Sequence, residues 1–351
     1  MIAVNNKKII KNDSCIKKEF RNMFLPIYVI QIIFLRQKFS LNDCELKSNS
    51  KKYYFITLLI NTFVKFYLIS LVYQSFIRNF TGSLRYIYMC IYALYIVDFV
   101  GKMMINLFLS DSHLQLVHQM HEIYILFNNQ SDTFCVKSVA WGTCVVYSVI
   151  YICLASAKLI LDPYWSWARV IYIFILYIED VDILFAIITV YSLANTMKRW
   201  NLIVKNKRSI NISKELPAKT MFILFQGIMD AIYLYQKVFQ WSVSILDDEL
   251  ALVSHMISII FWIGKGIILE VLLCYMCNKL YKNVEESQAI VASTNDKYSA
   301  KLSKNIFWEY AINYRKINAW GIFTIDASLP FRFVSVIASY TIVLLQFALQ
   351  K

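Results

Sequence analysis

Glycine, proline and charged residues are all scarce in this chain of 351 residues. Seven Gly and four Pro are too few for a collagen-like or linker-rich protein. Charged residues make up 17% of the chain and apolar residues 58%, whereas a soluble domain usually has about 25% and about 45 to 50%. A single soluble core cannot bury this excess, and an aromatic content of 16% excludes a disordered chain. The composition therefore predicts a helical membrane protein.

Motifs of enzyme and metal sites are also missing. No Gly-rich phosphate loop and no nucleophile elbow occurs in the sequence. His113, His118 and His121 lie close together but have no Cys or acidic partner at metal-ligand spacing, so we interpret them as solvated or packing side chains. Cys274 and Cys277 lie within an apolar run, which favours packing over metal binding. We therefore expect no enzyme activity, no metal and no cofactor.

The excess of basic residues is distributed along the chain. Lys and Arg number 36 against 23 Asp and Glu, a formal net charge of +13. These basic residues lie between apolar runs instead of forming one stripe, which indicates membrane topology and argues against a nucleic-acid partner. The eight Cys lie mostly inside apolar runs, so we expect no disulfide framework.

Seven apolar runs are candidates for membrane-spanning helices. Six are strong, and the seventh, 219–246, is weaker because it contains four polar or charged residues; the strong runs are 53–77, 84–109, 134–160, 168–193, 250–278 and 331–349. The first apolar stretch, Phe24 to Leu35, is short, and we interpret it as an interfacial or cytoplasmic helix. Only the polar stretch 283–304 is predicted to be disordered.

The basic segments decide the orientation. Residues 1–52, the loop 194–219 and the segment 279–320 are rich in Lys and Arg, which predicts that all three are cytoplasmic. The loop 194–219 and the segment 279–320 can lie on the same side of the membrane only if the run 219–246 also crosses it. The predicted fold is therefore an all-α membrane protein with seven transmembrane helices, a cytoplasmic N-terminus and an extracellular C-terminus. Asn79 lies in a sequon of a predicted outer loop and is a glycosylation candidate.

The most specific residues lie near the C-terminus. The last apolar run contains Ser339-Tyr340, five mostly apolar residues and Gln346-Phe347, and Ala319-Trp320-Gly321-Ile322-Phe323-Thr324-Ile325-Asp326 precedes it. These elements resemble the signature of the insect gustatory receptor family, with Ser339 where Thr is usual. The resemblance implies a tetrameric, ligand-gated, non-selective cation channel whose pore is lined by the seventh helix of each subunit.

The residues of the last run also indicate a pore by themselves. Ser335, Ser339, Ile342 and Gln346 recur at spacings of 4, 3 and 4, which places them on one stripe of a helix. Polar members of such a stripe face a pore, water or another helix, so helix-helix hydrogen bonding remains the alternative. The family resemblance favours the pore and assigns Gln346 and Phe347 to its narrow outer part.

Charged side chains near the middle of the spans form a second group. These charged side chains are costly if they face lipid, so we expect them to face the helix bundle. They are Lys65, Lys265, Asp98, Glu179, Asp180 and Asp182. They form either a ligand pocket open to the outside or structural ion pairs. Glu179 and Asp182 share a helix face, and Asp180 points about 100° away from them. The pocket candidates are Tyr92, Tyr95, Asp98, Tyr147, Tyr151, Tyr172, Glu179, Asp182 and Trp262.

The leading functional hypothesis is a gustatory receptor channel in the plasma membrane, opened by a small extracellular tastant. Its expected partners are the tastant, membrane lipid and other subunits in a homo- or hetero-tetramer, and no nucleic acid. The alternatives are a secondary transporter that uses the mid-membrane charges and a subunit of a heteromeric channel that binds no ligand. The predicted parts of the chain are a cytoplasmic segment (1–52), six spans with the pocket (53–278), a cytoplasmic anchor (279–330) and the pore helix (331–351).

Overall fold

The computed structural model is mainly helical, as the composition predicts. It describes residues 18–33, 38–41, 46–79, 108–127, 130–161, 167–209, 218–239, 254–292, 316–319 and 323–349. Its helices are α1 (Lys18–Ile33), α2 (Lys51–Asn79), α4 (Ser110–Phe127), α5 (Gln130–Leu161), α6 (Trp167–Ser209), α7 (Ala218–Phe239), α8 (Ser254–Ala292) and α10 (Leu329–Leu349). Two antiparallel hairpins accompany them, β1 (Ser40–Leu41) with β2 (Leu46–Lys47) and β3 (Asn318–Ala319) with β4 (Phe323–Thr324).

The chain divides into two compact units. Unit 1 comprises Met1–Ile152 and Ser166–Val181, and unit 2 comprises Cys153–Trp165 and Asp182–Lys351. Helices α5 and α6 each contribute residues to both units, whereas every other described element belongs to one. Each unit has its own core.

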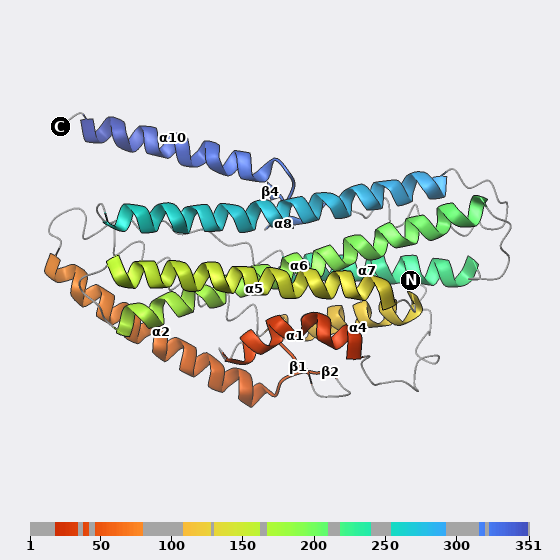
Figure 1. Cartoon of the computed structure of the whole chain (residues 1–351), viewed down its shortest axis with the longest axis horizontal. Coiled ribbons are helices and arrows are strands. Elements are labelled where there is room, and N and C mark those ends of the chain that lie inside the picture. Colours follow the sequence, from red (N-terminus) through yellow and green to blue (C-terminus); the bar gives the residue numbers. More distant parts are fainter. Residues whose placement is uncertain are drawn as a thin grey trace. The chain divides into compact units, whose positions relative to one another are not determined.

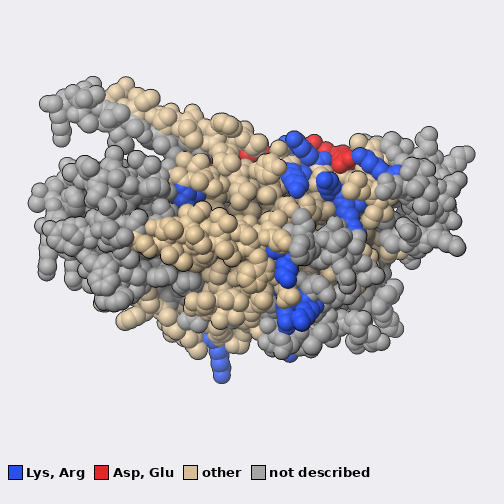
Figure 2. Space-filling model, viewed as in Figure 1, with Lys and Arg blue, Asp and Glu red and all other residues tan. Residues whose placement is uncertain are grey.

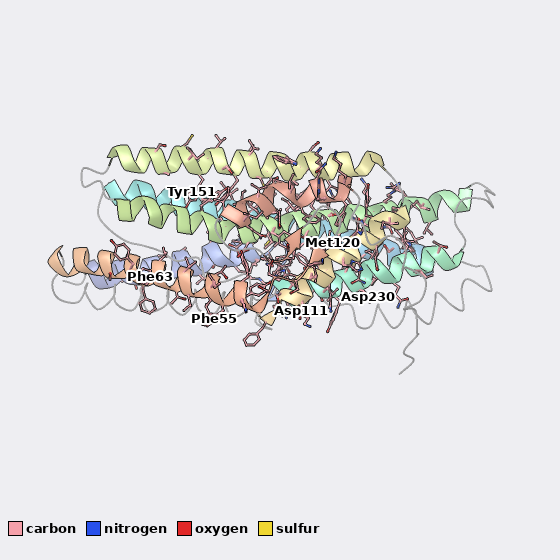
Figure 3. The ribbon with its side chains drawn as sticks, turned by 90° about the horizontal axis from the view of Figure 1, so that it is seen from below. Phe55, Phe63, Asp111, Met120, Tyr151 and Asp230 are labelled. Carbon is pink, nitrogen blue, oxygen red and sulfur yellow. The ribbon has the colours of Figure 1, made fainter. Side chains whose placement is uncertain are left out.

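The core of unit 1 joins α1 to α4. Phe20, Phe24 and Ile27 of α1 are buried, as are Leu116 and Met120 of α4. Met120 is labelled in Figure 3. The Phe20 ring lies 5.0 Å from the His121 ring and 5.7 Å from the Tyr124 ring, measured between centroids. The apolar stretch predicted as an interfacial helix from Phe24 is thus a helix, but it begins at Lys18, because this earlier turn also buries apolar residues against α4.

Pro26 lies inside α1 without a break in the helix. Proline has no N–H, so the carbonyl oxygen four residues earlier, that of Asn22, loses its helical hydrogen bond. The Trp141 indole N–H of α5 donates to this oxygen over 3.2 Å. A side chain of another helix therefore satisfies the group that Pro26 leaves open, and it ties α5 to α1 within unit 1.

Helix α2 begins at a serine cap and presents an apolar surface. The Ser50 hydroxyl accepts a hydrogen bond of 3.2 Å from the Tyr53 amide, which satisfies an N–H of the first turn. Farther along, Phe55 and Phe63 are 60% and 75% exposed and point outward (Figure 3). Leu59 and Phe66 are exposed too. Such a face suits lipid rather than water.

Unit 2 is built around the second part of α6. Every residue from Leu184 to Val190 is buried, so this stretch is covered on all sides. Helix α7 runs antiparallel along it: the rings of Phe185 and Phe239 lie 5.6 Å apart, and those of Trp200 and Phe225 lie 4.9 Å apart. The weak apolar run at 219–246 is therefore, over its described part, a helix with one face packed against α6, and its polar residues do not prevent this packing.

Helix α8 runs parallel to α6. The Lys279 amine lies 3.3 Å from the Asn195 side-chain oxygen, and Lys205 pairs with Glu286 about three turns farther along α6 and about two turns farther along α8. The described parts of the basic segments that follow residues 193 and 278 thus lie side by side. The number of spans remains a prediction, because most of 84–109 lies outside the described residues.

Two predicted irregular segments are helical instead. The loop expected at 194–219 continues α6 as far as Ser209, and the disorder expected at 283–304 was wrong as far as Ala292. Both extensions are polar in composition, but they bury Met197 and Trp200 on α6 and Val284 and Ile290 on α8. Tertiary packing therefore decides their structure.

Helix α10 follows the second hairpin, contacts α8, and diverges from it toward the C-terminus (Figure 1). Pro330 is its second residue, where the missing N–H removes no helical hydrogen bond. Within the described residues, two helical stretches are both long and apolar enough to cross a membrane, Val136–Cys153 and Asp180–Lys205. On the face shown in Figure 2, most of the described surface carries neither Lys or Arg nor Asp or Glu.

Candidate functional site

Three tyrosines and an aspartate meet inside unit 1. The Tyr147 hydroxyl of α5 donates a hydrogen bond to the Asp180 carboxylate of α6, and the Ser148 and Tyr177 hydroxyls lie 2.7 Å apart. The centroid of the Tyr177 ring is 5.9 Å from that of Tyr147 and 4.8 Å from that of Tyr151. The four side chains of this tyrosine cluster, Tyr147, Tyr151, Tyr177 and Asp180, are 5 to 9% exposed.

The tyrosine cluster is closely packed. The three rings contact one another, and the carboxylate receives its hydrogen bond from within the group. A buried carboxylate is costly unless it is hydrogen-bonded, so the Tyr147 hydroxyl stabilises Asp180 in its place. The arrangement resembles a structural joint between α5 and α6 more than an open ligand pocket.

Of the predicted pocket residues, only Tyr147 and Tyr151 are brought together. Asp182 is half-buried on the unit 2 part of α6. The others lie outside the residues whose side chains are described: Tyr92, Tyr95, Asp98, Tyr172, Glu179 and Trp262. The side chains of Lys65 and of the sequon residue Asn79, which ends α2, are likewise outside them.

Sequence reasoning missed the partners that the structure gives to Tyr147 and Tyr151. Tyr177 and Asp180 are three residues apart and share a helix face, as do Tyr147 and Tyr151, which are four apart. Glu179 and Asp182 share a different face of the helix from Asp180, so the pair of acidic residues on that face does not indicate this pattern. Two matching stripes of aromatic and acidic residues on consecutive helices were the signal that identifies the cluster.

Replacing Tyr147 with Phe is expected to destabilise the protein by about 2 kcal/mol, because it leaves the buried Asp180 carboxylate without this donor. The companion Tyr177→Phe removes a hydroxyl that pairs with the neutral Ser148 and should cost about 1 kcal/mol. Melting temperatures of the detergent-solubilised variants measure both. An equal or larger loss in Tyr177→Phe would contradict the role given to the carboxylate.

The stripe predicted on the last helix is solvent-accessible in the single chain. Ser335, Ser339, Ile342 and Gln346 are all exposed on α10, and the side chain of Phe347 lies outside the described residues. The Ser339 hydroxyl donates to the Ser335 carbonyl oxygen over 2.8 Å, so it stays within its own helix. No described side chain of the same chain covers this stripe.

The residues before α10 form a hairpin and a hydrogen-bonded turn that leads into the helix. Ala319 and Phe323, two positions of the family-like motif, pair across the β3–β4 hairpin. Asp326 then accepts hydrogen bonds from the Ser328 amide, over 2.9 Å, and the Ser328 hydroxyl, over 2.6 Å. The Ser328 hydroxyl holds the pKa of Asp326 below its ordinary value, so the carboxylate stays charged at the N-terminus of α10.

A buried polar network joins the extensions of α6 and α8. The Asn201 amide nitrogen donates to the Asn283 carbonyl over 2.9 Å, and the Ser287 hydroxyl donates to the Asn201 side-chain oxygen over 2.5 Å. Asn283 in turn donates to the Ala194 carbonyl over 2.7 Å. Asn201 and Ser287 are 1% and 0% exposed. We call these residues the anchor network.

A half-exposed ion pair lies at the edge of the anchor network. Glu286 accepts hydrogen bonds from Lys205 and, over 3.1 Å, from Asn201. The Lys205 ammonium holds the pKa of Glu286 below its ordinary value. Exposed ion pairs contribute little to stability, so the buried amides carry most of the attachment.

The three histidines on α4 divide into two kinds. His113 is buried, and this burial, with the positive charge of Lys38, lowers its pKa well below the ordinary value. His121 is buried against Phe20. His118 is exposed and pairs with Glu122 over 3.3 Å, and this hydrogen bond raises its pKa. The interpretation as packing and solvated histidines is thus confirmed.

The thiols of the CxxC pair are packing groups. Cys274 and Cys277 are both buried on α8 and are not joined to each other. Among the described residues, no three His, Cys, Asp or Glu side chains are grouped as metal ligands.

The comparison with known families agrees with the resemblance of the C-terminal residues. The sequence model of the 7tm Chemosensory receptor family matches residues 195–351. This stretch includes the last turns of α6, the anchor network, the β3–β4 hairpin and α10. No curated protein is significantly similar to the chain. Over residues 195–351 the chain is thus similar to the 7tm chemosensory receptors, a family of membrane proteins.

Proposed function

We propose that the protein is a taste receptor channel: a tetramer in the plasma membrane that conducts cations when a small extracellular ligand binds. The family match supports a role in chemoreception. The observation that supports a pore is the polar stripe on α10: the described side chains from residue 331 to 346 are all exposed in the single chain, and Ser335, Ser339 and Gln346 are polar members that share one face.

The composition of the stripe fits a closed and gated path. Four copies of α10 around one axis would surround it with serine hydroxyls and a ring of Gln346 amides. Ile342 is 56% exposed in the single chain and would form an apolar ring between them. Apolar constrictions resist wetting, so such a ring closes the path until the helices move apart.

The ligand site belongs in this proposal to the outer part of the bundle. The tyrosine cluster is closed, so the candidate ligand-binding residues are the predicted pocket residues that do not belong to it. Among them are Asp182, Tyr92, Tyr95 and Asp98. A ligand there would bind side chains that are otherwise costly to keep within a membrane.

Replacing Gln346 with Ala is expected to change permeation and leave ligand affinity unaltered. Loss of the amide ring alters the barrier for a passing cation, so reversal potentials under ion substitution or the basal current should change. Whole-cell recording with a panel of tastants measures both, together with the half-maximal ligand concentration.

The matched control is Ser339→Thr, which keeps the hydroxyl on the same stripe and should behave like the wild type. If Gln346 instead bonds a neighbouring helix, the Ala variant will assemble poorly and the surviving channels will keep wild-type selectivity. That result would remove Gln346 from the pore.

A further inference from the structure

One side chain of α8 is built into the β3–β4 hairpin. The Ile325 amide donates to the Ile317 carbonyl oxygen over 2.8 Å, which is one bond of an antiparallel pair. The Tyr281 hydroxyl bridges the other two polar groups of this pair: it accepts from the Ile317 amide over 3.0 Å and donates to the Ile325 carbonyl over 2.9 Å. The second hydrogen bond of this pair is thus replaced by two hydrogen bonds to the Tyr281 hydroxyl of α8.

The site of this bridge is buried. Tyr281, Ile317 and Ile325 are 2%, 0% and 2% exposed, so the hydroxyl and the two backbone groups satisfy one another away from the surface. The Lys316 ammonium lies over the Tyr281 ring, 5.7 Å from its centroid. Asp326, which starts α10, is the next residue after Ile325. The position of the hydroxyl therefore sets where α10 begins.

The same part of α8 is held by α6. Asn283 and Ser287, the anchor residues of α8, lie within two turns of Tyr281. A displacement of the joined α6 and α8 must consequently move the hairpin, and with it the first turn of α10. Without the hydroxyl, Ile317 and Ile325 can pair directly, and the hairpin keeps its fold but loses its attachment to α8.

We propose that Tyr281 is the joint through which α6 and α8 position the pore helix α10, so that ligand-driven movement of the bundle reaches the gate. This role in gating rests on the proposed channel function, whereas the positioning of the hairpin does not.

Two measurements on Tyr281→Phe test the joint, with Tyr275→Phe as the matched control. Tyr275 lies on the same helix, but its side chain is 62% exposed. The first measurement is the distance distribution between spin labels at Glu285 of α8 and Asn318 of the hairpin, both exposed positions. The labelled subunit is diluted with unlabelled chains and lacks other reactive cysteines. We expect a broadened or shifted distribution in Tyr281→Phe alone.

The second measurement is the current per surface channel over a ligand concentration series. With ligand binding unchanged, Tyr281→Phe should alter the maximal or the basal current roughly five-fold or more, as for other allosteric couplings. Wild-type gating in this variant would overturn the role in gating. If the wild type itself carries no current, the proposed function fails, and the label distances still decide the positioning: equal distributions in all three proteins would overturn it.

Discussion

Replacing Asn201 with Ala is expected to cost about 3 kcal/mol of stability, the largest effect of any single change proposed for this chain. The substitution removes the donor to the Asn283 carbonyl and the acceptor for the Ser287 hydroxyl, and both remain buried. The Ser287 hydroxyl can still donate to the Asn283 carbonyl over 2.8 Å, so the expected loss is that of the three hydrogen bonds of the Asn201 side chain, at about 1 kcal/mol each. Melting temperature and the yield of folded protein at the cell surface measure the loss.

The anchor network also provides its own control. Asn195→Ala, six residues earlier on α6, removes only a half-buried contact to Lys279 at 3.3 Å and should cost less than about 1 kcal/mol. A double-mutant cycle of Asn201→Ala with Ser287→Ala should be non-additive by about 1 kcal/mol, because the two share a hydrogen bond. Additive losses would show that the network does not act as a unit.

Lowering the pH from 7 to 5 is expected to destabilise the wild type through His113. Its pKa is far below the ordinary value of about 6.5 in the folded protein, so below that pH the unfolded chain binds one proton more. Stability is fully present above about pH 6.5 and then falls by about 1.4 kcal/mol per pH unit. Carboxylates with lowered pKa values, such as Asp326, titrate only at lower pH.

His113→Gln should flatten this decline, whatever its effect on stability at pH 7. The control is His118→Gln on the same helix. Glu122 raises the pKa of His118, so that its contribution is present at low pH and lost as pH rises, the opposite sign. Melting temperatures across this pH range measure the slopes. An unchanged slope in His113→Gln would show that His113 is not the group that titrates.

The sequence predicts the helical class and the C-terminal elements because both depend on local patterns. Long apolar runs allow few structures other than helices in a membrane. The motif from Ala319 to Asp326 is likewise local: its residues pair across one hairpin and cap the next helix. Such features need no knowledge of the rest of the fold.

The extensions of α6 and α8 could not be predicted in this way. Their composition is that of a solvated loop, and their helical structure depends on contacts across 82 to 89 residues, such as those of Asn201 and Asn283. The same holds for Tyr281, whose partners lie 36 and 44 residues away. Spacing along one helix does not show that a tyrosine completes a hairpin elsewhere.

The length of α8 has a mechanical consequence. Its 39 residues extend about 58 Å, nearly twice the roughly 30 Å of a bilayer's hydrocarbon core. If the helix rotated as a rod by about 5° around its midpoint, each end would move by about 2.5 Å. In the channel proposed above, a small rotation near the middle of α8 would therefore produce a larger displacement at its ends, because the length of the helix acts as a lever arm.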